Sequence, residues 1–358
     1  MLDFIDPFNL KQKFDIFNVI RDFGKNIADD YNFLQLIRKT FLPIPFIDQT
    51  TTPRTDIFPP FNYKPIPFFS GKKIAMVNSG GSGALVTMCG IYRAFEEAGI
   101  DITAISVCSG SALWGTLIAA GMSAQEMTEF TLSWNDADYL DLEWSRVLKA
   151  LLTAGKGFSG LLRGEAVEKT YRKRLGEIRL SQSPIRYYTI VYNMDLGQVE
   201  YFGSGLKPDV TLAKAVRVSI ALPLFVESVD VGGHLYNDGG IIDIFPVEPL
   251  LKYEKDVDFF IGVNCIFPKN FISEDISGWR DKHFAIFEAS EQLRFANWLD
   301  LGRRNLDLVK DRILLLHPLP YTEIRGKNFY SIFVDRQRWT DLILRAYHYT
   351  RKELDKFR

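Results

Sequence analysis

The sequence has few of the residues that would indicate a metal centre, a disulfide framework or a redox cofactor. Its 358 residues include three cysteines and four histidines. The cysteines, Cys89, Cys108 and Cys265, are far apart and lie in apolar runs, so we expect no disulfides and a reducing compartment. Neither they nor the histidines have metal-binding spacing. We therefore expect no metal and no cofactor.

The chain also lacks an excess of charge and a long apolar run. Its formal net charge is -1 at pH 7, so no basic field indicates a nucleic-acid partner. We expect no signal peptide, because no basic segment followed by an apolar core opens the sequence. We expect no transmembrane helix, because no stretch of about 18 apolar residues occurs. These absences favour a cytoplasmic location, while the oligomeric state is left open.

Residues 1–71 differ in composition from the rest of the chain. Apolar residues at three- and four-residue spacing between Leu10 and Ile27 predict an amphipathic helix. Prolines then crowd the stretch from Phe41 to Phe69 and exclude regular helix and sheet there. This extended arm is interpreted either as a strap on the rest of the chain or as a membrane- or partner-contacting segment. We predict two domains, an N-terminal arm at 1–71 and a catalytic domain at 72–358.

From Lys72 onward, apolar strand-like runs alternate with amphipathic helical segments. Lys72–Asn78 and Ile102–Val107 read as buried strands, and each is followed by a helix. This order predicts an α/β fold with a mainly parallel sheet covered by helices on both faces. Ligand-binding groups in such folds lie at the carboxyl ends of the strands. The Gly-rich segment Gly80–Gly83 and Ser109 both follow such strands, and we expect them to be near neighbours.

The stretch Ile102–Gly115, ITAISVCSGSALWG, predicts a strand, a tight turn and a helix, with Ser109 at the turn. We interpret Ser109 as a catalytic nucleophile. Acyl transfer also needs a base and donors for the oxyanion. Asp238, followed by two glycines, is the candidate base, and burial beside an apolar pocket would raise its pKa to a useful value. Glycines 80, 81 and 83 bring backbone N–H groups to the start of a helix expected from Ala84.

Other interpretations of these segments are weaker. A P-loop would need a lysine after Gly83, and a dinucleotide-binding loop would need glycine where Val86 stands. The carboxylates of Asp243 and Glu248 are interpreted as surface charges.

Together these motifs resemble those of the patatin-like phospholipases, a family of lipid acyl hydrolases that use a Ser–Asp dyad. SGGSGALVTMCGIYRAFEEAGI resembles the family's oxyanion loop and helix. VCSGSALWG resembles its nucleophile turn, and the turn is closest to the cytosolic phospholipase branch. The stretch that ends in LYNDGGIIDIFPV resembles the segment with the catalytic aspartate. The resemblance extends from about Lys72 to Lys356.

The resemblance implies a three-layer patatin-like fold and a serine esterase that cleaves phospholipids or acylglycerols. It implies Ser109 as nucleophile and Asp238 as base. The implied oxyanion and substrate-binding residues are Gly80, Gly81, Ser82, Gly83 and Gly110. The implied partners are a lipid ester and, peripherally, a membrane or lipid surface.

Three positions depart from the family pattern. Val107 and Ser111 replace the two glycines of G-x-S-x-G, and the arginine of the family's oxyanion loop is missing near Ala84 or Leu85. The missing cation favours neutral esters such as acylglycerols over phosphate-bearing substrates. The basic residues considered as substitutes are Lys156, Arg163 and Arg217.

Two alternatives stay open. One is a non-catalytic patatin-like protein that binds a lipid or a partner. The other is an α/β-hydrolase that uses Ser109, Asp238 and His317, which occur in the chain order of that fold.

Overall fold

The computed structural model describes residues 56–141, 159–265, 267–272, 285–324, 332 and 336–358. All of them belong to the second of the two units into which the chain divides, Thr50–Arg358. The predicted amphipathic helix near the start of the chain and a helix predicted over Leu142–Ala154 lie outside these residues. The boundary of the two domains at residue 71 stays a prediction.

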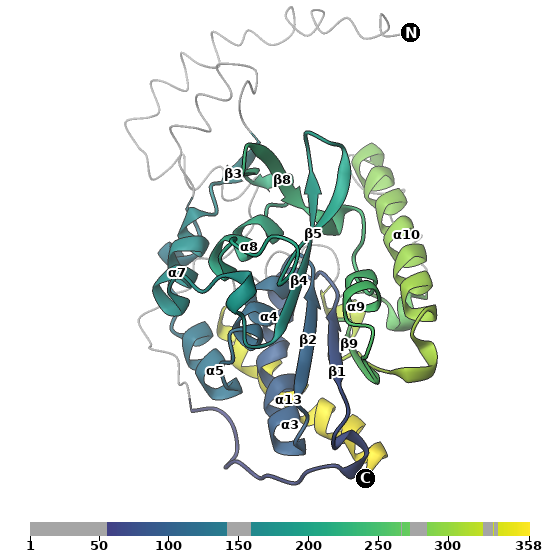
Figure 1. Ribbon diagram of the computed structural model, residues 1–358. Coiled ribbons are helices and arrows are strands. Elements are labelled where there is room, and N and C mark those ends of the chain that lie inside the picture. Colours follow the sequence, from purple (N-terminus) through teal and green to yellow (C-terminus); the bar gives the residue numbers. More distant parts are fainter. Residues whose placement is uncertain (1–55, 142–158, 266, 273–284, 325–331, 333–335) are drawn as a thin grey trace, which may run out of the picture. The chain divides into compact units, whose positions relative to one another are not determined.

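The described residues form a three-layer α/β structure around an eight-stranded sheet (Figure 1). Five parallel strands make up most of it, in the spatial order β10-β9-β1-β2-β4. Their bounds are Ile313–Leu316 for β10, Phe259–Val263 for β9, Ile74–Asn78 for β1, Ile102–Val107 for β2 and Arg186–Asn193 for β4. Strands β1 and β9 are buried along their whole length, as expected of parallel strands covered on both faces. The predicted mainly parallel sheet is confirmed.

Three antiparallel strands complete the sheet around β4. They are β5 (Gln198–Gly203), β7 (Val229–Val231) and β8 (His234–Asp238). Strand β5 pairs with β4 from Tyr188 to Asn193 and so occupies one edge of β4. Two strands share the other edge of β4. Strand β2 pairs with residues 186–189 of β4, and β8 pairs with residues 191–193. Strands β2 and β8 therefore run toward each other along the same edge of β4.

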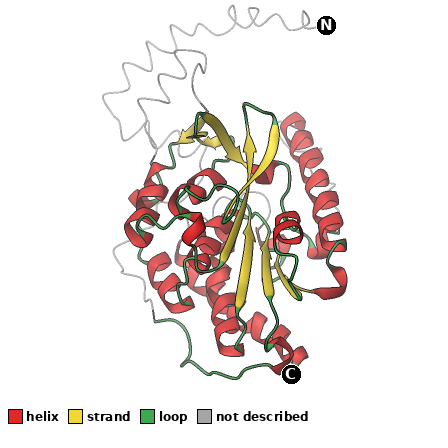
Figure 2. Ribbon diagram, viewed as in Figure 1, coloured by secondary structure: helices red, strands yellow, loops and turns green. Residues whose placement is uncertain are grey.

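Helices cover both faces of the sheet, as Figures 1 and 2 show. One layer contains α3 (Thr87–Ala98), α4 (Ser111–Ala119), α5 (Ala124–Leu132) and α13 (Trp339–Leu354), with α7 (Glu165–Leu175) and α8 (Leu212–Ser219) beside α4. The opposite layer contains α9 (Glu248–Tyr253) and α10 (Ala285–Asp307). A small second sheet pairs β3 (Gly160–Leu162) with β6 (Leu224–Val226), and a short helix α11 (Tyr321–Ile324) follows β10. No described helix has both the length and the apolar character to cross a membrane.

The described part of the Pro-rich arm, residues 56–71, packs on α3 as a strap. Its backbone donates to the carbonyls of Glu97 and Ala98, at 2.7 and 2.9 Å. Phe58, Ile66 and Phe69 are buried in the core. The strap interpretation therefore holds for these residues.

The segment after β1 begins differently from the predicted helix. Ser82–Val86 forms a 3₁₀ turn, and the α-helix α3 starts at Thr87 rather than at Ala84. The cause is local, because Ser82 has a left-handed backbone (φ 49°) and Gly81 accepts the first turn's hydrogen bond from Ala84. The helix ends at Ala98, where Gly99 forms a left-handed cap.

Candidate active site

Ser109 lies at the carboxyl end of β2, on the turn into α4. Its backbone φ is 54°, a left-handed conformation that costs free energy for a residue other than glycine. Within the fully described stretch Ala104–Ala119, it is the one residue that is not buried. The turn thus presents the Ser109 side chain at the edge of a buried sheet.

The two departures from G-x-S-x-G have local compensations. Ser111 Oγ accepts a hydrogen bond from Cys108 N and donates to Cys108 O, both at 2.8 Å, and so fixes the backbone on the strand side of Ser109. Val107 fits because α4 has a glycine opposite it. A Cβ on Gly115 would lie 2.4 Å from Val107 Cγ1. The turn therefore tolerates larger residues at both positions.

The Gly-rich loop after β1 lies directly against this turn. A Cβ on Gly110 would lie 2.5 to 2.8 Å from backbone atoms of Ser82, so a glycine is required for the two backbones to approach. Ser82 is the one residue between Ile74 and Ile91 that is not buried, and all of these residues are described. The predicted proximity of Gly80–Gly83 and Ser109 is therefore found, because β1 and β2 are adjacent parallel strands.

Gly80 differs in role from the prediction. Its N–H donates to the carbonyl oxygen of Ile244 at 3.0 Å. It thus ties the loop to the segment that follows Asp238, and this N–H is not available to an oxyanion. The candidate donors that remain are the N–H groups of Gly81, Ser82, Gly83 and Gly110.

Asp238 ends β8 and is 1% exposed. Its Oδ1 accepts a hydrogen bond from Gly240 N at 2.8 Å. Burial raises the pKa of Asp238 to about 7, and the nearby Ser109 side chain and the Gly240 N–H act in the opposite direction. At neutral pH such a carboxylate can both accept and return a proton.

Strand register explains how Ser109 and Asp238 meet from positions 129 residues apart (238 − 109). Val107, at the end of β2, lies opposite Thr189 of β4, and Asp238, at the end of β8, lies opposite Val191. The gap between the two strand ends is two residues of β4, which is about 7 Å. Asp238 borders this gap on one side, and Ser109 follows two residues after Val107 on the other side.

A second buried carboxylate supports the segment after Asp238. Asp243 is 8% exposed, so its interpretation as a surface charge was wrong. Its Oδ1 accepts from Phe245 N at 3.0 Å and from Asn305 Nδ2 of α10 at 2.9 Å, and burial raises its pKa to about 6. Its carbonyl oxygen lies 3.5 Å from the sulfur of Cys108. Sequence spacing gave no sign that α10 would hold this segment.

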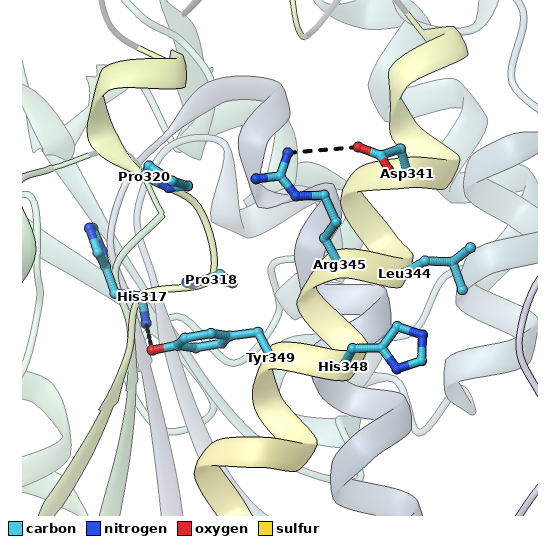
Figure 3. Close-up of a pocket in the computed structure, with 8 residues that line it drawn as sticks. All are labelled: His317, Pro318, Pro320, Asp341, Leu344, Arg345, His348 and Tyr349. Carbon is cyan, nitrogen blue, oxygen red and sulfur yellow. Dashed lines mark hydrogen bonds and ion pairs between the residues drawn. The ribbon is translucent and has the colours of Figure 1, made fainter.

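His317 lies in a different place. It follows β10, and three steps in the sheet order separate β10 from β2, a distance of roughly 14 Å. Its Nδ1 is 2.6 Å from the carbonyl oxygen of Asn264, and its backbone N–H donates to the Tyr349 hydroxyl. It lines an open depression of about 750 Å³ (Figure 3), whose lining includes neither Ser109, Asp238 nor any residue of the Gly-rich loop. The structure does not bring His317 to Ser109 and Asp238.

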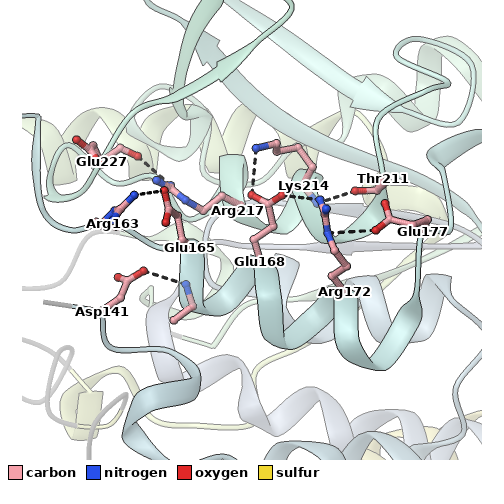
Figure 4. A network of polar contacts seen from close by, with 11 residues as sticks. Asp141, Arg163, Glu165, Glu168, Arg172, Glu177, Thr211, Lys214, Arg217 and Glu227 are labelled. Atoms are coloured by element: carbon pink, nitrogen blue, oxygen red, sulfur yellow. Dashed lines mark hydrogen bonds and ion pairs between the residues drawn. The ribbon is translucent and has the colours of Figure 1, made fainter.

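The two described arginines considered as substitutes for the missing loop arginine contact other groups (Figure 4). Arg217 is 4% exposed and donates to the carbonyl oxygen of Glu227 at 2.9 Å, and Arg163 pairs with Glu165. Lys156 lies outside the described residues. At the place of the arginine, Ala84 and Leu85 are buried. Neither described arginine supplies a cation beside the Gly-rich loop.

The fold and this arrangement of loop, serine and aspartate define a class of three-layer α/β proteins with a Gly-rich loop beside a serine turn. The patatin-like phospholipase family matches residues 76–251, which include Ser109, Asp238 and the Gly-rich loop. The chain therefore contains a patatin-like phospholipase domain over these residues.

Curated relatives agree with the family. An uncharacterized NTE family protein of Mycobacterium bovis is 28% identical over 195 residues, which are 54% of this chain and 50% of that protein. The lysophospholipase nte1 of Neurospora crassa is 26% identical over 196 residues, 55% of this chain and 12% of that protein. The chain thus spans about half the length of the mycobacterial relative.

Among solved structures, the human GIVD cytosolic phospholipase A2 aligns with a TM-score of 0.45 at 9% identity. The alignment covers 80% of this chain and 58% of the human protein.

Proposed function

We propose that this protein is a lipid acyl hydrolase that cleaves carboxylic ester bonds with a Ser109–Asp238 dyad. The observation that carries the proposal is that an accessible serine and a buried aspartate meet where β2 and β8 end, close enough for the Ser109 side chain to lower the pKa of Asp238. The family match and the name of the Neurospora relative support the substrate class.

In the proposed mechanism, Asp238 takes the hydroxyl proton as Ser109 Oγ attacks the ester carbonyl carbon. The carbonyl electrons move to its oxygen, and N–H groups of Gly81, Ser82, Gly83 and Gly110 stabilise the oxyanion. The intermediate expels the alcohol, which takes the proton from Asp238, and the acyl group stays on Ser109. Water then gives a proton to Asp238 and attacks the acyl carbon. Ser109 Oγ leaves and regains the proton, and the carboxylic acid is released.

The surroundings of the loop favour neutral esters. A phosphate beside Ser109 would need a cation to offset its charge, and Ala84 and Leu85 occupy the place of the family's arginine. Of the arginines considered as substitutes, Arg217 donates to the carbonyl oxygen of Glu227 and Arg163 pairs with Glu165. We therefore rank acylglycerols above phospholipids as substrates.

A fluorophosphonate probe and a panel of p-nitrophenyl esters, acylglycerols and phospholipids test the proposal. We expect labelling at Ser109 and ester hydrolysis by the wild-type chain. Ser109→Ala should abolish both, and Asp238→Asn should strongly reduce both. Ser181→Ala, which changes an exposed serine, is the matched control and should keep both.

Folded protein that is neither labelled nor active on any ester would favour the non-catalytic alternative. Equal labelling of Ser109→Ala and wild type would likewise exclude Ser109 as the nucleophile.

A further inference from the structure

The β4–β5 turn and the start of β8 form an apolar surface above the dyad. We call this surface the crest and define it as Met194–Leu196 together with His234 and Leu235. The exposed fractions of Met194, Leu196 and Leu235 are 48%, 55% and 44%. The two parts contact each other directly, because Met194 N donates to Leu235 O at 2.8 Å. Neighbouring exposed aliphatic side chains of this kind mark an interaction surface more often than scattered ones do.

Buried polar groups hold the crest in place. Asn193 is fully buried, and its Oδ1 accepts from the N–H groups of Asp195 and Leu196, each at 3.1 Å. The Asp195 carboxylate accepts from Leu235 N at 2.8 Å. The tip that displays Met194 and Leu196 is therefore a fixed turn, so little ordering is needed when it meets a partner.

The crest lies on the side of the sheet from which a substrate reaches Ser109. Val191 is opposite Asp238, and Met194 is three residues further along in the same direction. The crest therefore stands about 10 Å above the dyad, beyond the carboxyl ends of the parallel strands. Figure 1 shows the β4–β5 hairpin rising above the sheet at the top of the view. Ile242, 40% exposed and four residues after Asp238, extends the apolar character toward the site.

The charges of the crest indicate which kind of lipid surface it can bind. Asp195 and His234 lie 3.6 Å apart, and the crest contains no lysine or arginine. Nearby Lys207 is 3.8 Å from Glu200, so its charge is offset. Attraction to anionic lipids requires clustered basic residues, which these segments do not provide. With one carboxylate and no fixed cation, the crest is not attracted to an anionic lipid surface, which leaves a neutral one as its complement.

We propose that the crest docks on an electrically neutral, zwitterionic lipid surface and places the dyad over it. This inference rests on the proposed function for the identity of the substrate, but binding itself needs no turnover. Other exposed apolar residues are less suitable. The Arg93 guanidinium lies 4.6 Å from the centroid of the Phe61 ring, so this residue of the strap already has a partner. Tyr63 is beside Gly99, at the end of α3 that is far from the Gly-rich loop.

Sedimentation of the full chain with phosphatidylcholine vesicles tests the crest. The background is Ser109→Ala, so no lipid is consumed. We expect Met194→Ser/Leu196→Ser to weaken vesicle binding about tenfold, since two half-exposed side chains lose the apolar area they would bury. Leu196→Trp should tighten binding. Leu308→Ser is the matched control, because Leu308 is 61% exposed but precedes β10 and so lies at the opposite edge of the sheet.

Equal binding of the crest variant and its parent would overturn the proposal, and so would binding that requires phosphatidylserine. A crest variant that changes oligomeric state without vesicles would instead identify a second copy of the chain as the occupant. Hydrolysis of a soluble p-nitrophenyl ester by crest variants that keep Ser109 separates the two proposals. Crest-dependent binding without ester hydrolysis would refute the proposed function alone. Hydrolysis without crest-dependent binding would refute the crest alone.

Discussion

Two places at the carboxyl edge of the sheet differ in their surroundings, although each has polar residues at the end of a strand. At the β2 and β8 ends, Ser109 meets a buried aspartate whose pKa is raised to about 7. At the β10 end, the His317 ring contacts the backbone carbonyl of Asn264, beside an open depression. A position after a strand is therefore not sufficient for a pair like the proposed dyad. Two chain segments must also end at the same point.

The most direct way to break this comparison is to remove the reactive group at each place. Ser109→Ala and Asp238→Asn should lower kcat/KM for a p-nitrophenyl ester by about four orders of magnitude. His317→Ala should change it by about twofold or less, because the sheet keeps His317 roughly 14 Å away. Steady-state kinetics on folded variants is the measurement. A loss of activity in His317→Ala that matches the loss in Ser109→Ala would restore the triad alternative.

Much of the structure around Ser109 and Asp238 could be predicted from the sequence, because strands and turns are encoded by short stretches of neighbouring residues. The apolar run Ile102–Val107 is β2 with the predicted bounds, and the Asp-Gly-Gly turn does end β8. The sharing of one β4 edge by β2 and β8 could not be predicted, because it depends on pairings between residues far apart in the chain. The same holds for the Gly80 hydrogen bond to Ile244 and for the burial of Asp243 under Asn305.

The raised pKa of Asp238 makes the stability of the active-site region depend on pH. Its folded-state pKa of about 7 is above the ordinary value of 3.8, so stability is complete below pH 4 and falls as pH rises toward and through 7. Asp238→Asn removes the buried charge and should stabilise the protein at pH 8 by about 2 to 4 kcal/mol.

The stabilisation by Asp238→Asn should shrink toward zero at pH 4. Denaturant unfolding at both pH values measures it. Asp230→Asn, at an exposed position of β7, is the control and should show no such pH dependence. An Asp238→Asn effect of equal size at pH 4 and pH 8 would contradict the assigned pKa.

The hydroxyl of Ser111 should matter more for activity than other buried hydroxyls of the same helix. Ser111→Ala leaves the buried Cys108 N–H without its acceptor, which costs about 1–3 kcal/mol of stability. We also expect roughly tenfold lower kcat, because the backbone that presents Ser109 loses its brace. Thr116→Val removes a buried hydroxyl that contacts Tyr187 on β4 and should lower stability without this loss of kcat. Equal kcat in the two variants would show that the Ser111 contact does not position the nucleophile.

The smallest effect is expected at the β10 end. Tyr349→Phe removes the acceptor of the His317 backbone N–H, and it should lower the free energy of unfolding by about 0.5–1.5 kcal/mol. Neither kcat nor KM for a soluble ester should change, since this hydrogen bond supports only the chain after β10. Thermal or denaturant unfolding together with steady-state kinetics measures both quantities. If kcat falls while stability stays the same, the β10 end is coupled to the dyad, and the contrast between the two places is weaker than their geometry indicates.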